Sequence, residues 1–150
     1  MSEQKVYQHW RKEQDSDDII WLYIDQAETK ANVLCRAVVE ELDSLLEEIE
    51  YDKPAGVIIT SGKRSGFIAG ADIKEFTTLE DQDDGFALVR RAQGVLDRLE
   101  VLHCPTVALI QGFCLGGGME LALACRYRVA IDDPKTKLGL PEVKLGIHPG

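Results

Sequence analysis

Long apolar runs are absent from this sequence. The longest apolar stretches, such as Thr106–Ile110, are only as long as a strand, whereas a membrane-spanning helix needs roughly 18 apolar residues. The N-terminal segment MSEQKVYQHWRKEQDSDD is polar and lacks the apolar core of a secretory signal. We therefore expect no membrane insertion and predict that the protein is cytoplasmic.

Basic residues are also scarce. The chain has 17 lysines and arginines against 26 aspartates and glutamates, which gives a net charge of −9. Because nucleic acids bind to basic faces, we expect no nucleic-acid partner. A small anionic ligand is compatible with this charge, since it needs only a local cluster of cations. The acidic residues gather in Glu40–Asp52 and Glu80–Asp84, which we interpret as solvated faces or loops.

Cysteine pairs of the metal-binding kind are missing. Cys35, Cys104, Cys114 and Cys125 form no CxxC motif, and no histidine stands at metal-ligand spacing from them. Each of these cysteines has apolar neighbours in the sequence. We predict four reduced, buried thiols, with neither a metal site nor a disulfide framework.

The sequence does contain an alternation of strand and helix patterns. Its 150 residues, 45% of them hydrophobic, suit one soluble domain. Short apolar runs predict strands at Ile19–Asp25, Gly56–Thr60, Thr106–Ile110, Tyr127–Asp132 and Thr136–Leu140. Helical spacing predicts helices over Val33–Glu50, Gly85–Leu102 and Met119–Arg126. This alternation indicates an α/β fold with parallel strands, in which ligands bind beyond the carboxyl ends of the strands.

The two longer predicted helices are amphipathic. The apolar positions of the first are Val38, Leu42, Leu45, Leu46 and Ile49. Those of the second are Phe86, Val89, Ala92, Leu96 and Leu99. We expect each of these faces to pack against other elements of the core.

A glycine-rich turn, Gln111–Gly118, precedes the third helix. It ends in three consecutive glycines, and Glu120 follows. Such a turn leaves backbone N–H groups uncovered at a helix N-terminus, which favours an anion or an oxyanion. A tight turn that needs glycine only for packing explains the pattern equally well. The turn is neither a Walker A loop nor a dinucleotide fingerprint, because its glycines are contiguous and no Gly-Lys-Ser/Thr follows.

A second apolar turn, Phe67–Glu75, follows the loop predicted over Ser61–Gly70. Ala71 has a minimal side chain, so its N–H could approach a ligand closely, and Asp72 is a candidate N-cap. The basic residues around this turn are Lys63, Arg64 and Lys74. They either serve an anionic ligand or are solvated at the surface. Both turns follow predicted strands, so we expect them to face one crevice.

Two glutamates, Glu120 and Glu142, stand near these turns. Taken singly, each is typical of an acid in the first turn of a helix, and Pro141 before Glu142 strengthens that interpretation. Their separation in sequence does not place them face to face. Asn32 is interpreted as the N-cap of the first helix. The histidines, which we expect to be structural or exposed, are His9, His103 and His148.

Three segments together resemble motifs of the crotonase, or enoyl-CoA hydratase, superfamily. They are Phe67–Glu75 (FIAGADIKE), Gln111–Glu120 (QGFCLGGGME) and Leu138–Gly150 (LGLPEVKLGIHPG). Their order and spacing agree with the family, and the resemblance runs from about Ile19 onward. The opening and the SGKRSGFIAGADIKEF stretch look most like the hydratase part of multifunctional fatty-acid oxidation proteins. The resemblance implies an α/β, crotonase-like fold, a spiral of ββα units, with residues 1–17 as an N-terminal extension.

The resemblance also implies roles for individual residues. The N–H groups of Ala71 and Gly117 would form an oxyanion hole around a thioester oxygen, and Glu120 and Glu142 would be the catalytic acids that hold one water. The coenzyme A site would be lined by Ala69, Gly70, Ala71, Asp72, Ile73, Lys74 and Gly116. The coenzyme A thioester is the substrate, and neither a metal nor a cofactor is expected in this segment.

The presence of both glutamates sharpens the implied chemistry. Several members of the family that catalyse other reactions lack one or both of them. Their joint presence favours hydration of trans-2-enoyl-CoA to 3-hydroxyacyl-CoA in fatty acid β-oxidation, with Δ3–Δ2 enoyl isomerisation as an accessory activity. The alternatives are an isomerase that acts mainly through Glu142, and a non-catalytic acyl-CoA-binding or assembly module.

The family's domain continues into helices that close the acyl pocket and mediate trimer packing. We therefore expect residues 1–150 to be the N-terminal portion of a hydratase domain, truncated before those helices and not fully active alone. Its exposed apolar surface should promote self-association. For the full-length protein we expect a homo-oligomer and a thiolase subunit as a partner. NAD is expected only for a dehydrogenase domain outside this chain.

Overall fold

Strands and helices alternate along the chain. The computed structural model describes residues 5–150. The strands are β1 (Trp10–Gln14), β2 (Ile19–Ile24), β3 (Gly56–Ser61), β4 (Gly66–Ile68), β5 (Thr106–Ile110), β6 (Phe113–Leu115), β7 (Tyr127–Ala130) and β8 (Lys137–Gly139). The helices are α1 (Arg36–Asp52), α2 (Ile73–Phe76), α3 (Gln82–Glu100), α4 (Gly117–Ala124) and the 3₁₀ helix η1 (Pro141–Leu145).

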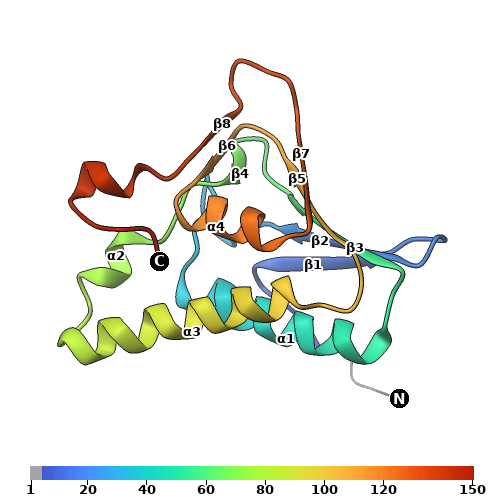
Figure 1. The fold of residues 1–150 in the computed structure, drawn as a ribbon, viewed down its shortest axis with the longest axis horizontal. Coiled ribbons are helices and arrows are strands. Elements are labelled where there is room, and N and C mark those ends of the chain that lie inside the picture. Colours follow the sequence, from blue (N-terminus) through green and yellow to red (C-terminus); the bar gives the residue numbers. More distant parts are fainter. Residues whose placement is uncertain (1–4) are drawn as a thin grey trace.

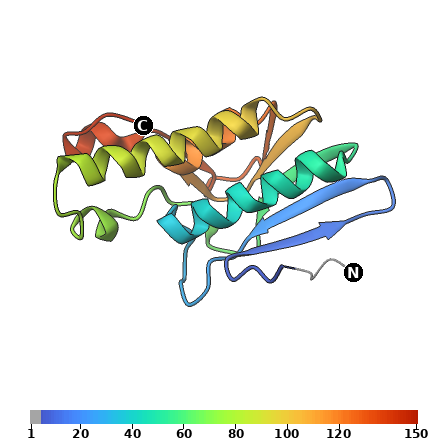
Figure 2. The ribbon, with the colours of Figure 1, turned by 90° about the horizontal axis from the view of Figure 1, so that it is seen from below.

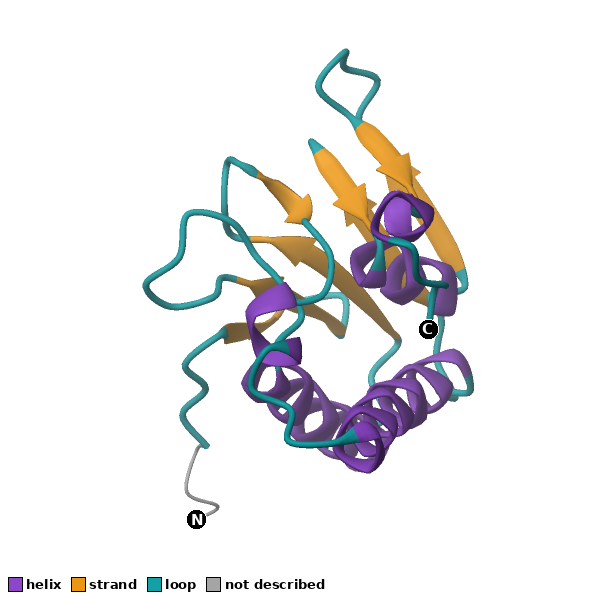
Figure 3. Ribbon diagram, turned by 90° about the vertical axis from the view of Figure 1, so that its left-hand side faces the viewer, coloured by secondary structure: helices purple, strands orange, loops and turns teal. Residues whose placement is uncertain are grey.

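A five-stranded sheet forms the larger layer (Figure 1). Its strand order is β1-β2-β3-β5-β7, with β1 antiparallel to β2 and all other neighbours parallel. Helices α1 and α3 lie side by side (Figure 2), and both are on one side of this sheet (Figure 3). The α/β architecture with mainly parallel strands is therefore confirmed. Strand β5 has its predicted bounds, and β2, β3, β7 and β8 differ from prediction only at their ends.

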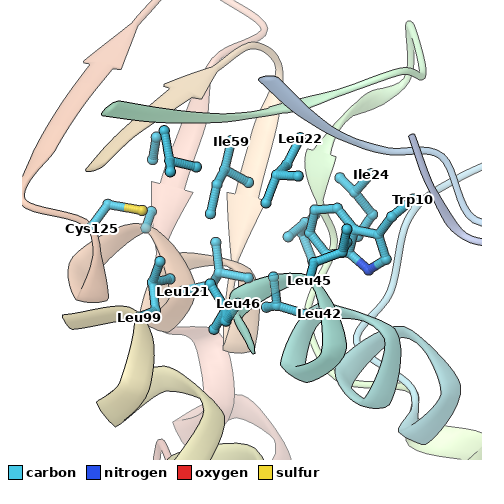
Figure 4. Close-up of a cluster of buried hydrophobic side chains, with 14 of the residues drawn as sticks. Trp10, Leu22, Ile24, Leu42, Leu45, Leu46, Ile59, Leu99, Leu121 and Cys125 are labelled. Atoms are coloured by element: carbon cyan, nitrogen blue, oxygen red, sulfur yellow. The ribbon is translucent and has the colours of Figure 1, made fainter. Parts of the chain in front are cut away.

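The main core lies between this sheet and the helices (Figure 4). Along β2, alternate residues are buried, which is the pattern of a strand with one face on the core. The predicted apolar face of α1 is confirmed, because all five of its residues are buried. Burial of one such leucine or isoleucine contributes about 1.5–3 kcal/mol. This stripe of side chains therefore fixes α1 against the sheet.

Helix α1 begins later than the sequence predicts. Its first residue is Arg36 and its N-cap is Cys35. The prediction that Asn32 is the N-cap is therefore wrong. The Asn32 side chain is fully buried and donates hydrogen bonds to groups far away in the sequence. Long-range contacts, which no local pattern reveals, determine its position.

The predicted face of α3 is only partly correct. Leu99 is buried as predicted, but Val95 takes the second buried position. Phe86 is 68% exposed. Val89, Ala92 and Leu96, also on the predicted face, line a cleft instead of being buried in the core.

Strand β1 and a second sheet are not indicated by the sequence pattern. In β1 only Trp10 is buried, and its indole N–H donates to the carbonyl of Val38 at 3.0 Å. The second sheet has the order β4-β6-β8, with parallel neighbours. Its strands β4 and β6 lie inside the predicted loop and the predicted turn, so those two predictions are wrong in part.

Glycine allows the strands of the small sheet to approach closely. Gly66 has a φ of 149°, and a Cβ built on it would lie 2.9 Å from the Phe113 ring. A larger residue would therefore push β4 away from β6. Because β4, β6 and β8 run parallel, their carboxyl ends meet at one edge. This edge positions the candidate site.

The cysteines are mostly buried, and part of the surface is apolar. All four cysteines are free, and three are buried as predicted, but Cys35 is only half-buried. Within residues 5–150, no cluster of side chains could hold a metal ion, and no helix is long and apolar enough to cross a membrane. An exposed apolar surface is present, as expected, at Tyr127, Val129, Ile131, Leu138, Leu140, Val143, Leu145 and Ile147.

Candidate active site

The carboxyl ends of β4, β6 and β8 border a cleft of about 730 Å³. Each strand is followed by a segment that contributes to its wall. Among the predicted site residues, those that line the cleft are Ala69, Gly70, Ala71, Asp72, Ile73, Gly116, Gly117, Glu120 and Glu142. The prediction of a shared crevice is confirmed, although the edge that forms it belongs to the small sheet. Lys74 is not among the lining residues.

The backbone at Ala71 is held by the segment before α1. The Leu34 N–H donates to the Gly70 carbonyl at 2.8 Å, and the Asp72 N–H donates to the Leu34 carbonyl at 3.1 Å. Leu34 and Ala71 thus form a parallel β-bridge. In such a bridge the central residue directs its own N–H away from the partner segment. Since Ala71 lines the cleft, its N–H is available there.

The consecutive glycines bring a second N–H beside the first. Helix α4 begins at Gly117, whose N–H is one of the first-turn donors that have no acceptor within the helix. A Cβ built on Gly117 would lie 3.7 Å from the Ala71 nitrogen. The two N–H groups are therefore neighbours. Gly118, one residue further on, packs so tightly that its Cβ would lie 2.6 Å from Ile68 Cβ, so the glycines serve both packing and the site.

Glu120 stands in the first turn of α4, close to these N–H groups. Its Oε2 lies 3.9 Å from the position that a Cβ on Gly117 would occupy. Burial raises the pKa of the Glu120 carboxyl above its ordinary value, and the nearby charge of Glu142 raises it further. A hydrogen bond from the Gly150 backbone N–H opposes both effects. The site therefore favours the protonated form of Glu120 more than water does.

Glu142 approaches the same glycines from the other side. It is in the first turn of η1, as its interpretation as a helix-start acid predicts. Its Oε1 lies 2.8 Å from the position that a Cβ on Gly116 would occupy, so a side chain at this position would displace the Glu142 carboxyl. Its Oε2 is buried and has no hydrogen-bond partner among the described residues. A buried carboxylate oxygen of this kind is ready to bind a polar group of a ligand.

The raised pKa of Glu120 leads to a prediction about stability. Because the folded state binds this proton more tightly than the unfolded state, the free energy of unfolding falls as pH rises from the ordinary pKa of 4.5 to the raised one. Glu120→Gln should therefore raise the free energy of unfolding at neutral pH, and the gain should vanish well below pH 4.5. Urea unfolding at both pH values, with the exposed Glu50→Gln as control, measures this. A Glu120→Gln protein that is less stable at neutral pH would contradict the prediction.

Apolar side chains form much of the remaining wall of the cleft. They come from the segment before α1, from α1 and α3, and from the C-terminal segment, and they are Leu34, Val39, Leu88, Val89, Ala92, Leu96, Leu145 and Ile147. The sequence pattern singles out three of them on α3, but as a packing face. The others carry no local signal that separates them from core residues. A polar edge next to an apolar wall suits a ligand with a reactive head and an apolar chain.

The predicted cations do not gather at this cleft. The Lys63 ammonium pairs with Asp25 at 2.8 Å, and neither Lys63 nor Arg64 lines the cleft. Asp72 is the N-cap of α2, as predicted, and accepts from the Lys74 N–H at 3.0 Å. The positive side chains that do line the cleft are Arg36 and Arg91.

The sequence profile of the enoyl-CoA hydratase/isomerase family matches residues 15–150. The chain belongs to this family. Among curated relatives, the α-subunit of the fatty acid oxidation complex of Aliivibrio fischeri is 48% identical over 143 residues, which are 94% of this chain and 20% of that protein. A probable enoyl-CoA hydratase of Bacillus subtilis is 48% identical over 120 residues, which are 80% of this chain and 46% of that protein.

Solved structures of enoyl-CoA hydratases confirm the crotonase-like fold. The enzyme from Bacillus anthracis matches with a TM-score of 0.87 and 33% identity, covering 95% of this chain and 54% of that one. An enzyme from Geobacillus kaustophilus also has a TM-score of 0.87, with 28% identity and coverage of 95% and 53%. This member of the enoyl-CoA hydratase/isomerase family thus spans about half the length of these solved hydratases. It spans about a fifth of the fatty acid oxidation subunit.

Proposed function

We propose that this protein supplies the chemical groups for hydration of trans-2-enoyl-CoA to 3-hydroxyacyl-CoA. Glu120 and Glu142 hold and activate one water, and the N–H groups of Ala71 and Gly117 bind the thioester oxygen. The observation that carries the proposal is the arrangement around the glycines. Both carboxyls lie against Gly116 and Gly117, beside the Ala71 nitrogen, in one cleft.

The two N–H groups act on the charge that develops during the reaction. When the water oxygen bonds to C3 of the enoyl chain, the electrons of the double bond move toward the thioester oxygen. Two fixed N–H dipoles from Ala71 and Gly117 stabilise this enolate-like charge without having to reorganise. In comparable sites the loss of one such donor costs about 10²–10³ in rate.

The two carboxyls complete the proton balance. One takes a proton from the water as its oxygen attacks C3, and the other gives a proton to C2 as the enolate collapses. This division needs two carboxyls whose pKa values differ. Burial and the nearby charge of Glu142 raise the pKa of the Glu120 carboxyl, and the unpartnered Oε2 of Glu142 is suited to contact the water.

The substrate class follows from the shape and lining of the cleft. The acyl chain would lie along the apolar wall formed with α3, and the coenzyme A portion would pass along Ala69–Ile73 and Gly116. In place of Lys74, the arginines Arg36 and Arg91 line the cleft and are the cations that could meet its phosphates. The name of the Aliivibrio fischeri relative supports a role in fatty acid β-oxidation.

Assays that resolve the two substrates test this function. The longest natural polypeptide that contains this sequence should hydrate a trans-2-enoyl-CoA rapidly and isomerise a 3-enoyl-CoA more slowly. Isomerisation moves a proton from C2 to C4 and needs chiefly one base, for which Glu142 is the candidate. A protein that isomerises the 3-enoyl substrate but does not hydrate the 2-enoyl substrate would replace the hydratase proposal with the isomerase alternative.

The activities and partners of the whole protein are further proposals. The resemblance of the sequence to multifunctional fatty-acid oxidation proteins is the basis for proposing, in a longer polypeptide, a 3-hydroxyacyl-CoA dehydrogenase domain that uses NAD and a thiolase subunit as partner. A homo-oligomer is likewise a proposal for the longer polypeptide, whereas the exposed apolar side chains of β7, β8 and η1 support self-association of residues 1–150 themselves. Light scattering of the purified protein at several concentrations measures this association.

A further inference from the structure

A fully buried asparagine lies directly behind the proposed oxyanion hole. Asn32 is 0% exposed. Its Nδ2 donates to the Ile24 carbonyl at 3.1 Å, to Ser61 Oγ at 2.9 Å and to the Phe67 carbonyl at 3.0 Å. Its Oδ1 accepts from the Gln26 N–H at 3.0 Å. One amide group therefore joins the carboxyl ends of β2 and β3 to β4.

The main chain of the same residue continues this connection. The Asn32 carbonyl accepts from the Ala69 N–H at 2.8 Å, and Leu34, two residues later, bonds to both Gly70 and Asp72. Hydrogen bonds to segment 32–34 thus hold the backbone on both sides of Ala71. Between these contacts, Gly70 has a φ of 123°, a conformation that side chains other than glycine rarely adopt.

Segment 32–34 anchors the turn, whereas Ala71 provides the N–H group that faces the cleft. Ala71 donates into the cleft, and its own position depends on neighbours that bond to segment 32–34. That segment is attached to the large sheet through the Asn32 side chain. Without this side chain, the Phe67 carbonyl, the Ile24 carbonyl and Ser61 Oγ would each lose one donor. The Ile24 carbonyl and Ser61 Oγ would keep the N–H groups of Gly62 and Lys63, and the segment would keep the bond from the Val33 N–H to Gln26 Oε1 at 2.9 Å. Its link to β4 through Phe67 would be gone, so the turn at Ala71 could shift relative to the large sheet.

We propose that Asn32 is a positioning residue for the reaction: it fixes the Ala71 N–H at the thioester oxygen. The proposal rests on the proposed function, because it requires a thioester bound at this N–H. Misplacement of a catalytic group by about 1 Å can cost 10²-fold in rate. Asn32→Ala should therefore lower kcat by about 10²-fold and change KM little, since the acyl and coenzyme A contacts are elsewhere.

A matched control separates positioning from stability alone. Thr60 is also buried, in the adjacent β3, and its Oγ1 donates to the Leu109 carbonyl at 3.0 Å. This bond joins β3 to β5 and touches no part of the turn at Ala71. Thr60→Val removes one buried hydrogen bond while keeping the shape of the side chain, so it should destabilise the fold and leave kcat within about twofold.

The decisive measurement is the carbonyl stretch of a bound 2-enoyl thioester labelled with ¹³C at the carbonyl. In the longest natural polypeptide that contains this sequence, binding should lower this frequency, because two N–H groups polarise the bond. The lowering should be largely lost in Asn32→Ala and kept in Thr60→Val. Asn32→Ser, which is small and retains one donor, should give an intermediate shift, and it serves as the test if Asn32→Ala does not fold.

The outcomes separate the two proposals. If the parent protein binds the thioester without any lowering of the frequency, the proposed oxyanion hole is wrong and the role of Asn32 falls with it. If the parent shows the lowering and folded Asn32 variants show it in full, with unchanged kcat, then Asn32 is only structural and the hydratase proposal stands. Equal losses in Asn32→Ala and Thr60→Val would also overturn the positioning role.

Discussion

Glu142→Gln is expected to lower the rate of trans-2-enoyl-CoA hydration by about 10²–10⁴-fold, with a smaller change in KM. Glutamine keeps the size of the side chain and can hydrogen-bond to water, but it cannot exchange a proton. Glu142 has a buried oxygen without a protein partner, so its replacement also leaves the core intact. The loss of the ultraviolet absorbance of the conjugated enoyl thioester measures the rate.

Glu120→Gln should produce a loss of similar size, and the double variant should reveal the coupling. If both carboxyls act on one water, the second substitution should lower the hydration rate far less than the first, because the first already removes the joint action of the pair. Glu50→Gln, at an exposed position of α1, is the control for a lost charge. Unchanged hydration and isomerisation rates in both single variants of the longest natural polypeptide would place catalysis outside this segment and support a non-catalytic acyl-CoA-binding or assembly module.

Gly118→Ala is expected to be the most destabilising small substitution near the site. An added Cβ would lie 2.6 Å from Ile68 Cβ and 2.7 Å from the Ile68 carbonyl oxygen. Part of this contact is backbone, so α4 or β4 must move. Overpacking of this kind typically costs about 1–3 kcal/mol. Helix α4 carries the Gly117 N–H, and Ala71 lies in the turn that follows β4. Urea unfolding should therefore show a lower free energy of unfolding, together with lost hydration.

Gly94→Ala provides the matched comparison. Gly94 is exposed in the interior of α3, and a Cβ built on it meets nothing within 4 Å. Alanine should therefore raise the free energy of unfolding by about 0.5–1 kcal/mol, because it restricts the unfolded chain and favours the helix. The interpretation of Gly118 would be wrong if its alanine variant were as stable as the parent protein.

Periodicity predicts the elements that have one clear environment. Helix α1 packs along its length on the sheet, so its apolar stripe appears in the sequence and is confirmed residue by residue. Helix α3 serves two environments, because Leu99 faces the core while Val89 faces the cleft. A single apolar stripe cannot distinguish the two environments, and it also includes Phe86, which is exposed.

Short or edge strands lack the signal that periodicity needs. Strands β4 and β6 have only three residues each and are flanked by glycine, so their sequence favours a turn. In β1 the residues after Trp10 are exposed and polar, which is typical of an edge strand and also of a loop. The partner strands that stabilise these segments are distant in the sequence, and their contribution is not visible locally.

The site was predictable only through the family pattern. Glu120 and Glu142 each fit the first turn of a helix, and both do occupy such a turn, so the local interpretation was correct but incomplete. The parallel β4-β6-β8 sheet brings them together, and that sheet was not predicted. Asn32 shows the converse, since a plausible local role as N-cap concealed a buried side chain with partners on three strands.

The two glutamates belong to elements that differ in how much of each is buried. Glu120 belongs to α4, whose Leu121 and Ala122 are buried in the core. Glu142 belongs to η1, which has no buried residue within residues 5–150. In the part of the chain that the structure describes, buried side chains of α4 therefore anchor Glu120 and the Gly117 N–H, whereas no buried side chain of η1 anchors Glu142.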